Sequence, residues 1–326
     1  MARSRKSRNV SRPTTSRRIG VESLEARELM AGNVDVTLSN GNLLLTGDNA
    51  GNGVQIRQIS ANKLAVVGLK QAGANTSING AGFQVFSGVT GSVTFNMNGG
   101  NDQVDVTNGQ GFFASQPGLP TSFQPVDFAR NVTVNLGDGN DLLAMEDADV
   151  NGGLKIDGGF DNGVDTIDLE GISTQGLKSL ALEIDTRGGA DVIDIEFADL
   201  AGSVDIDSGN ENDFVKLFFA EIGGDLTIRT QAGEDTVQLF DVAILDDLLI
   251  DAGNDDDIVT AVEVTVADEV DILMGFGDDT LQIFRLIAVN AELDGGPGTD
   301  RLEDGGENEF GFLDVDSFEQ IVDVSE

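Results

Sequence analysis

The sequence predicts an all-β fold, a parallel β-helix whose coils each hold three strands in about 22 residues. An aspartate returns every 22 residues through much of the chain, and apolar residues recur around each aspartate at the offsets +2, +4, +7, +9, +13 and +15. A fixed period of this size is typical of proteins in which each repeat is one supersecondary unit stacked on its neighbours. Apolar pairs two residues apart have the period of a strand, so three pairs per repeat indicate three short strands joined by turns.

The recurring aspartates, called the rung aspartates below, define the coils. Coils of a β-helix stack about 4.8 Å apart, so equivalent side chains of successive coils should lie above one another. The β-branched strand runs and the glycine in each repeat argue against a helical solenoid. The general handedness of parallel crossovers predicts a right-handed coil. The rung aspartates are Asp102, Asp141, Asp165, Asp191, Asp213, Asp235, Asp257, Asp279 and Asp300.

Composition narrows the chemistry. The chain has 57 acidic and 19 basic residues, a net charge of −38, and it contains neither histidine nor cysteine. A Ser-His-Asp triad, a Cys-His dyad and an ordinary zinc site are therefore excluded, and no disulfide can form. So acidic a surface favours cations or basic partners and predicts that the protein does not bind nucleic acid.

Residues 1–32 differ from the rest of the chain. Residues 1–30 hold eight Lys or Arg and three Glu, whereas residues 31–326 have a net charge of −43. The stretch Val21–Gly32 resembles the L-E-x-R-x-L-x-A segment at the start of many large bacterial surface proteins, which implies export to the cell surface or the extracellular space. The alternative is a basic tail that folds back on the acidic body. The chain has no apolar run long enough for a standard signal peptide or a transmembrane helix.

The remaining sequence divides into three parts. Residues 33–98 keep a degenerate form of the repeat, with Gly53 at the expected rung, and are predicted to form N-terminal coils and a cap. Residues 99–305 carry the regular repeats, interrupted by a loop at 109–128 that is rich in proline and phenylalanine. The apolar spacing resumes after this loop, so the helix should continue through it. Residues 306–326 lose the period and are predicted to form the second cap.

The turns before the rung aspartates suggest a ligand. Gly295–Leu302 reads G-G-x-G-x-D-x-L, and Gly137–Leu143 and Gly275–Leu281 repeat its G-x-G-x-D-x-L core. These turns resemble the nonapeptide of RTX proteins, a secreted calcium-binding family, and the resemblance implies Ca²⁺ held between stacked turns. Carboxylate and carbonyl oxygens are the ligands that Ca²⁺ prefers. The candidate metal ligands are Asp141, Asp165, Asp191, Asp213, Asp235, Asp257, Asp279 and Asp300, with Asp138, Asp255 and Asp278 beside them.

The match to the RTX pattern is partial. RTX coils contain two nonapeptides, whereas each unit here has a single glycine turn, and Gln231 and Glu211 stand where a glycine is expected. The alternative is that the aspartates cap turn amides, as Asp and Asn do in many turns.

The function predicted from these features is non-catalytic. The chain should be a secreted or cell-surface calcium-binding rod of structural or adhesive role, with cell-envelope or extracellular-matrix components as partners. The alternative is a β-helix polysaccharide lyase or hydrolase. Such an enzyme needs one clustered constellation of charged groups, and the basic side chains of the body occupy different offsets. These residues are Lys155, Lys216, Arg229 and Arg285.

Overall fold

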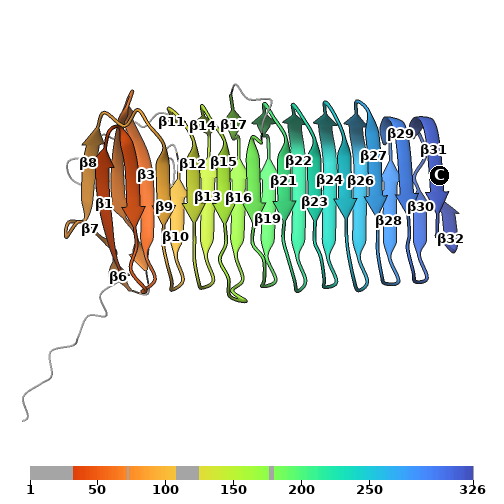
Figure 1. Ribbon diagram of the computed structural model, residues 1–326, viewed down its shortest axis with the longest axis horizontal. Coiled ribbons are helices and arrows are strands. Elements are labelled where there is room, and N and C mark those ends of the chain that lie inside the picture. The colour runs from red at the N-terminus through yellow and green to blue at the C-terminus, as the bar shows by residue number, and fades with distance from the viewer. Residues whose placement is uncertain (1–31, 72, 108–124, 176–179, 326) are drawn as a thin grey trace, which may run out of the picture.

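The computed structural model confirms the all-β prediction. It describes residues 32–71, 73–107, 125–175 and 180–325, which form strands and turns without a helix. The strands stack into a β-solenoid of about nine turns with a spacing of about 22 residues. The molecule is a straight rod along which the strands from β9 onward follow one another in chain order (Figure 1). The expected export segment lies outside the described residues, apart from Gly32.

The first strands of successive coils form one continuous parallel stack, in which each strand pairs with its equivalent in the next coil. Its members are β3 (Gly53–Ser60), β10 (Gln103–Val106), β13 (Leu142–Glu146), β16 (Thr166–Glu170), β19 (Val192–Glu196), β22 (Phe214–Ile222), β24 (Thr236–Ile244), β26 (Ile258–Val266), β28 (Thr280–Phe284), β30 (Arg301–Asp304) and β32 (Gln320–Asp323).

The third strands form a second parallel stack on the opposite side of the coil. They are β2 (Asn42–Thr46), β9 (Val93–Asn96), β12 (Val132–Asn135), β15 (Leu154–Asp157), β18 (Leu182–Asp185), β21 (Val204–Asp207), β23 (Leu226–Arg229), β25 (Leu248–Asp251), β27 (Glu269–Leu273), β29 (Ile287–Asp294) and β31 (Glu309–Asp316).

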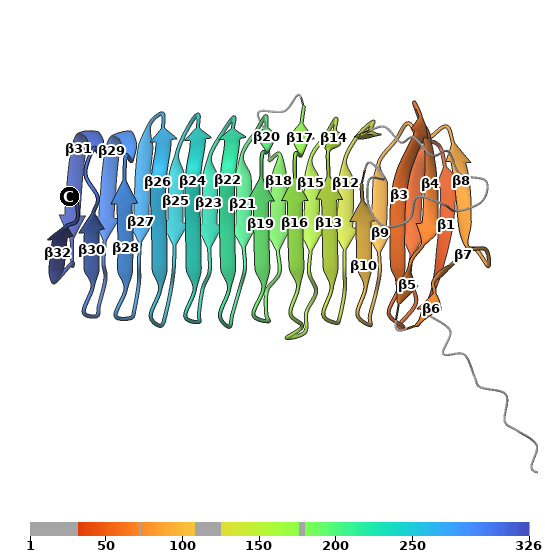
Figure 2. The same cartoon turned by 180° about the vertical axis from the view of Figure 1, so that it is seen from behind.

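Short second strands connect these two stacks. They are β11 (Val126–Phe128), β14 (Ala148–Val150), β17 (Ser173–Thr174) and β20 (Asp199–Leu200). In later coils the first and second strands join across a bend, so that β22, β24 and β26 each cover both sides. Figure 2 shows the same succession from behind.

The core is a column of aliphatic side chains inside the coil. In the coil of Asp235, all six apolar positions predicted from the sequence are at most 1% exposed. Each fully buried aliphatic side chain contributes roughly 1.5–3 kcal/mol relative to an exposed one. The offsets that define the repeat are therefore the inward positions of three strands. The six residues are Val237, Leu239, Val242, Ile244, Leu248 and Ile250.

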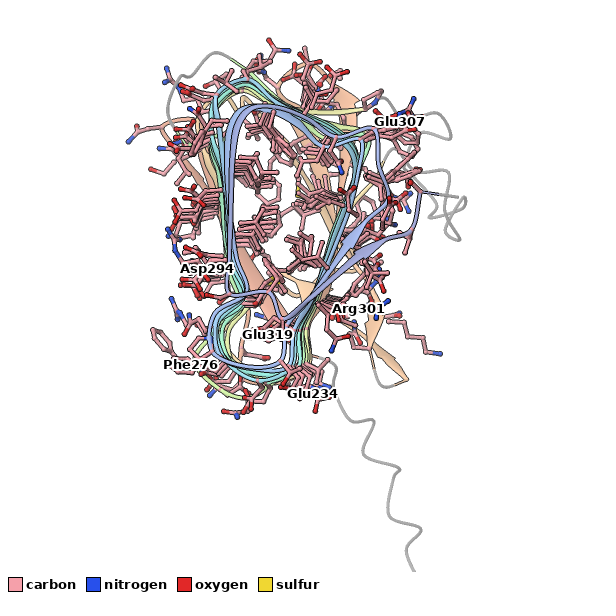
Figure 3. The ribbon with its side chains drawn as sticks, turned by 90° about the vertical axis from the view of Figure 1, so that its right-hand side faces the viewer. Glu234, Phe276, Asp294, Arg301, Glu307 and Glu319 are labelled. Carbon is pink, nitrogen blue, oxygen red and sulfur yellow. The ribbon has the colours of Figure 1, made fainter. Side chains whose placement is uncertain are left out.

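The handedness can be followed from the C-terminal end of the rod (Figure 3). The chain runs from Asp294 on the left, through the lower turn to Arg301 on the right, and up to Glu307. This path is counterclockwise as the chain advances towards the viewer, so the coil is right-handed, as predicted.

The insertion lies between the first and second strands of its coil. Residues 109–124 of the predicted 109–128 loop lie outside the described residues. Val126 and Phe128 belong to β11, point inward and are at most 1% exposed. The following strand β12 pairs with both β9 and β15, so the coil register is the same on either side of the insertion.

The N-terminal end is closed by antiparallel strands. β1 (Asn33–Ser39) pairs antiparallel with β2, and β4 (Lys63–Gly68) lies antiparallel between β3 and β8 (Phe83–Ser87). The short strands β5 (Lys70–Gln71), β6 (Ala74–Asn75) and β7 (Ser77–Ile78) complete this region. Leu64, Val66 and Ile78 are at most 2% exposed, which shows that these strands cover the end of the core.

The C-terminal end is built differently. β31 and β32 continue the parallel stack as one more coil within the predicted cap. Ile321 is 63% exposed although its register partner Leu302 is 4% exposed, and Leu313 is 44% exposed although its partner Ala291 is 2% exposed. The inward positions of the last coil therefore lie at the open end of the rod.

Candidate functional site

The turns before six of the nine rung aspartates have a left-handed backbone at two positions, four and two residues before the aspartate, and the turns before Asp279 and Asp300 have it only four residues before. Glycine occupies most of these positions, and Gly189 has a φ of 119°. Its Cα packs against the preceding coil, where an added Cβ would lie 1.6 Å from the carbonyl oxygen of Gly163. Gln231 and Glu211 adopt the same conformation with φ values of 61° and 73°. The turns in which one of the two glycines is replaced therefore keep the left-handed backbone at both positions.

The rung aspartates point into the turn rather than out of it. All nine are at most 3% exposed. Oδ1 of each accepts a hydrogen bond from the backbone N–H of the rung residue in the preceding coil, with N–O distances of 2.6–3.0 Å. The predicted residues Asp141 to Asp300 thus form one continuous column, which we call the inner ladder. The capping of backbone amides that the sequence left as an alternative is present, and it acts between coils.

Two further residues extend the inner ladder beyond the aspartates. Asn52, and not the expected Gly53, is in register with Asp102 at the N-terminal end, and its backbone N–H donates to Asp102 Oδ1 at 2.6 Å. At the other end Glu319 Oε2 accepts the N–H of Asp300 at 2.8 Å. Figure 3 shows Glu319 where the coil narrows. Neither residue is an aspartate and the sequence around each is irregular, so the aspartate repeat did not reveal them.

The second carboxylate oxygen of the inner ladder is buried without a hydrogen-bond partner among the described residues. An unpaired polar atom removed from water costs about 1–3 kcal/mol, and an uncompensated charge costs more. The inner ladder therefore requires some form of compensation. The unpartnered atoms are Oδ2 of Asp102, Asp141, Asp191, Asp213, Asp235, Asp257, Asp279 and Asp300.

This environment favours the protonated form of the aspartates. Burial raises the pKa of Asp213 to about 8, and the charges of Asp191 and Asp235 act in the same direction. The N–H bond from Asp191 opposes the shift without cancelling it. Burial also raises the pKa of Asp102, Asp165 and Asp257 to about 8, of Asp141 to about 7, and of Asp191, Asp235 and Asp279 to about 6.

The side chain five residues before the rung aspartate determines the surroundings of the unpartnered Oδ2 atom. Three consecutive coils place a hydroxyl there, those of Thr186, Ser208 and Thr230, and each hydroxyl lowers the pKa of its carboxyl against the effect of burial. Thr186 and Thr230 donate to backbone carbonyls of the next coil, and Ser208 Oγ has no partner among the described residues. Leu136 and Met274 are the apolar equivalents in other coils, where they are fully buried. The part of the inner ladder formed by Asp191, Asp213 and Asp235 therefore has more side-chain oxygen atoms than the coils with Leu136 or Met274.

The remaining predicted ligands lie on the outside of the turns. Asp138, Asp255 and Asp278 are exposed and do not join the inner ladder. Asp278 belongs to an outer ladder formed one residue before the rung, in which a side-chain oxygen accepts the backbone N–H of the next coil. Asp256 Oδ1 accepts the N–H of Asp278 at 2.8 Å, and Asp278 Oδ1 accepts that of Thr299 at 2.9 Å. The turn is thus joined to its neighbours by two ladders of opposite direction.

A separate acidic group was not predicted from the sequence. Asp225, Asp246 and Asp247 can place carboxylate oxygens within 4.8 Å of one another, and all three are exposed. Asp225 and Asp247 already accept backbone N–H groups of Asp247 and Glu269. Their proximity follows from a side-chain ladder at the opposite turn.

The basic side chains considered for an enzyme are engaged with neighbouring acids. Lys155 pairs with Glu183, Arg229 with Asp205 and Arg285 with Glu263. Lys216 pairs with Glu196 and lies 3.3 Å from the Asp194 carboxylate. The structure does not bring these four cations together.

Comparison with known proteins does not place the chain in a family. A scan against models of protein families, a search of curated proteins and a search of solved structures each returned no match. The described residues also contain no helix of the length and apolarity needed to cross a membrane.

Proposed function

We propose that the protein is a non-catalytic, secreted or cell-surface rod whose inner ladder is stabilised by Ca²⁺. The observation that carries the proposal is the column of eight buried Oδ2 atoms without hydrogen-bond partners among the described residues. When bound, Ca²⁺ would neutralise stacked carboxylates and complete the coordination of oxygens that the protein leaves unpaired. The basic N-terminal segment and the acidic body are consistent with an exported protein of structural or adhesive role.

The residues fit a cation best in the middle of the ladder. Asp191, Asp213 and Asp235 supply carboxylate oxygens, and the hydroxyls of Thr186, Ser208 and Thr230 lie beside them. A Ca²⁺ ion takes six to eight oxygens, so a site must draw on several neighbouring coils and on water. Coils with Leu136 or Met274 at the equivalent position offer an apolar surface and fit less well. The preferred positions therefore differ from Asp141, Asp279 and Asp300, where the glycine pattern is most complete.

The decisive experiment measures Ca²⁺ binding and stability together. Urea unfolding of the full chain at pH 8 should shift to higher urea concentration in millimolar Ca²⁺ than in EGTA, and calorimetry should detect Ca²⁺ binding. Asp213→Asn should reduce both effects because it removes a central carboxylate and retains an oxygen acceptor for the N–H of Asp191.

Asp246→Asn is the matched control, because it removes a carboxylate from the exposed acidic group and leaves the inner ladder intact. A Ca²⁺ effect lost in Asp246→Asn and kept in Asp213→Asn would contradict the assignment to the inner ladder. Equal stability of the unmodified protein in EGTA and in Ca²⁺ would reject the calcium proposal. Recovery of the intact protein from cytosolic fractions alone would reject the surface location.

A further inference from the structure

A notch runs along the rod where the third strand of each coil meets the glycine turn. In Figure 3, Asp294 and Phe276 project from the two sides of this notch. It widens into one pocket of about 410 Å³ beside Asp157 and Phe160, and into another of about 500 Å³ beside Asp251 and Phe276. Each pocket combines at least one carboxylate of the third-strand stack with a phenylalanine on the outer turn.

The two phenylalanines hold equivalent places. Phe160 follows Gly159 and Phe276 follows Gly275, and both glycines have left-handed backbones with φ values of 141° and 98°. Phe160 is 86% exposed and Phe276 is 61% exposed. Both rings therefore lie largely exposed on the outer turn.

The notch beside Phe160 contains a guanidinium group supplied by the protein itself. Arg187 Nη2 lies 2.7 Å from Asp157 Oδ2, and its Nε lies 3.0 Å from Asp185 Oδ2. Its Nη1 donates to the carbonyl oxygen of Gly159 at 3.2 Å, and its Cζ lies 3.8 Å from the centroid of the Phe160 ring. Two carboxylates, a carbonyl and an aromatic face thus bind one guanidinium.

The larger pocket has similar groups and no arginine seated between them. Asp251, Leu273 and Asp294 follow one another in register on three successive coils, so the Cα atoms of the two aspartates lie roughly 10 Å apart with Leu273 between them. Asp251 has no ion pair or side-chain hydrogen bond among the described residues, and Asp294 Oδ1 accepts only the N–H of Gly296. Arg229 lines one end of the pocket but pairs with Asp205 in the preceding coil.

We propose that the pocket between Asp251, Asp294 and Phe276 binds an arginine side chain of a basic partner polypeptide. The guanidinium would pair with a carboxylate of the third-strand stack and stack on Phe276, while its aliphatic stem lies on Leu273. The strongly negative body attracts a basic partner over a longer range. This site is separate from the inner ladder and does not depend on the proposed binding of Ca²⁺.

Arginine fits this pocket better than lysine. A planar guanidinium can stack on an aromatic ring while its edge donates to a carboxylate, as Arg187 does with Phe160 and Asp157. The ammonium of lysine is more strongly hydrated and cannot stack in this way. Preference for arginine is therefore the signature that separates this site from general attraction to an acidic surface.

The first test is an NMR titration of the full chain in EGTA. The titrant is a glycine pentapeptide with one central arginine and with both ends capped so that they carry no charge. Phe276→Ala should weaken binding about two- to five-fold without any change in protein charge. Phe219→Ala, which truncates another exposed phenylalanine, should leave the affinity unchanged. The lysine peptide should bind more weakly than the arginine peptide. Equal affinity for both peptides together with no effect of Phe276→Ala would overturn the proposal.

The carboxylate is tested in the same titration. Asp251→Asn should weaken arginine binding by about three- to ten-fold, whereas Asp199→Asn removes an exposed carboxylate outside the notch and should have a much smaller effect. An equal loss in the two variants would show that the peptide responds to net charge alone and would reject the site.

A gain of binding provides the most direct test. Arg187→Gln should empty the notch beside Phe160, and the backbone should tolerate glutamine because Gln231 adopts the same turn conformation with a φ of 61°. The number of arginine peptides bound per chain should then rise from one to two, and Phe160→Ala in that background should remove the added site. An unchanged stoichiometry would contradict the proposed role of the notch in guanidinium binding.

Discussion

The backbone N–H of Asp191 donates to Oδ1 of Asp213 at 2.8 Å across the boundary between two stacked coils. The equivalent bond joins every pair of neighbouring rungs from Asn52 to Glu319. Each carboxylate therefore stabilises the coil that precedes its own. The stability of the rod should depend on the acceptor oxygen and on the charge of these residues in different ways.

Two substitutions of Asp213 distinguish the contribution of its hydrogen-bond acceptor to stability from that of its negative charge. Asp213→Ala should lower the free energy of unfolding by about 1–3 kcal/mol in EGTA at pH 8, because the buried N–H of Asp191 loses its acceptor. Asp213→Asn should cost less, since its amide oxygen replaces Oδ1 and its NH₂ group can donate to the unpartnered Ser208 Oγ. Urea unfolding measures both variants. A loss in Asp213→Asn as large as that in Asp213→Ala would contradict this role of the acceptor.

The metal-free rod should be more stable at pH 5 than at pH 8. Burial raises the pKa of the eight rung aspartates from Asp102 to Asp279 to about 6–8, whereas an aspartate in the unfolded chain has a pKa of about 3.9. Between these values the folded state binds more protons than the unfolded state, so stability falls as pH rises. The contribution is fully present below about pH 4 and is lost through the range of pH 6–8.

Thermal unfolding in EGTA at several pH values measures this dependence. Asp257→Asn should make the decrease between pH 5 and pH 8 less steep, because Asp257 has a pKa of about 8 in the folded state. Asp199→Asn controls for the general reduction in negative charge. A midpoint that rises with pH in the unmodified protein would show that the inner ladder is compensated in another way.

Gly189 should tolerate no side chain. Gly189→Ala would force an L-residue to a φ of 119° and place its Cβ 1.6 Å from the Gly163 carbonyl oxygen. We expect a loss of about 2–4 kcal/mol from backbone strain and displacement of the neighbouring turn. Gly82→Ala is the matched control, because an added Cβ there meets no atom within 4 Å. Similar urea midpoints for the two variants would contradict the close packing of the turns.

Lys216 should contribute a salt-dependent stabilisation. It lies on β22 beside the carboxylates of Asp194 and Glu196, which are two residues apart on the neighbouring strand β19, and hydrogen bonding to Glu196 raises its pKa. Lys216→Gln should cost about 0.5–1 kcal/mol at low ionic strength and less at high salt, because exposed ion pairs are screened. Lys155→Gln provides a comparison with a single ion pair. The prediction fails if the cost of Lys216→Gln is independent of salt.

The sequence predicted the core because the inward positions repeat with the strand period. Val237 and Leu239 are two residues apart and face the same side, which follows from the geometry of any strand. The 22-residue period then placed equivalent residues in one column. Residues outside the regular repeat were harder to assign, and the register shows Asn52 in the position where Gly53 was expected.

The direction of the rung side chains could not be derived from their spacing. An aspartate in a glycine turn can point outward towards a ligand or inward towards a backbone amide, and both choices give the same periodic pattern. The inward direction depends on the left-handed residues before it, including Gln231 and Glu211, which do not have the glycine signature. The notch was also missed, because it arises from the path of the turn and joins Arg187 to Asp157 and Phe160 from another coil.

The two turn ladders have a mechanical consequence. Asp213 donates its N–H forward to Asp235, while the neighbouring Glu234 donates its N–H back to Asn212, so the same two coils are joined by adjacent bonds of opposite direction. Tension that peels a coil from either end must break bonds of both kinds together with the strand pairing. The turns should therefore resist unzipping from both ends, and the rod should yield in steps of whole coils.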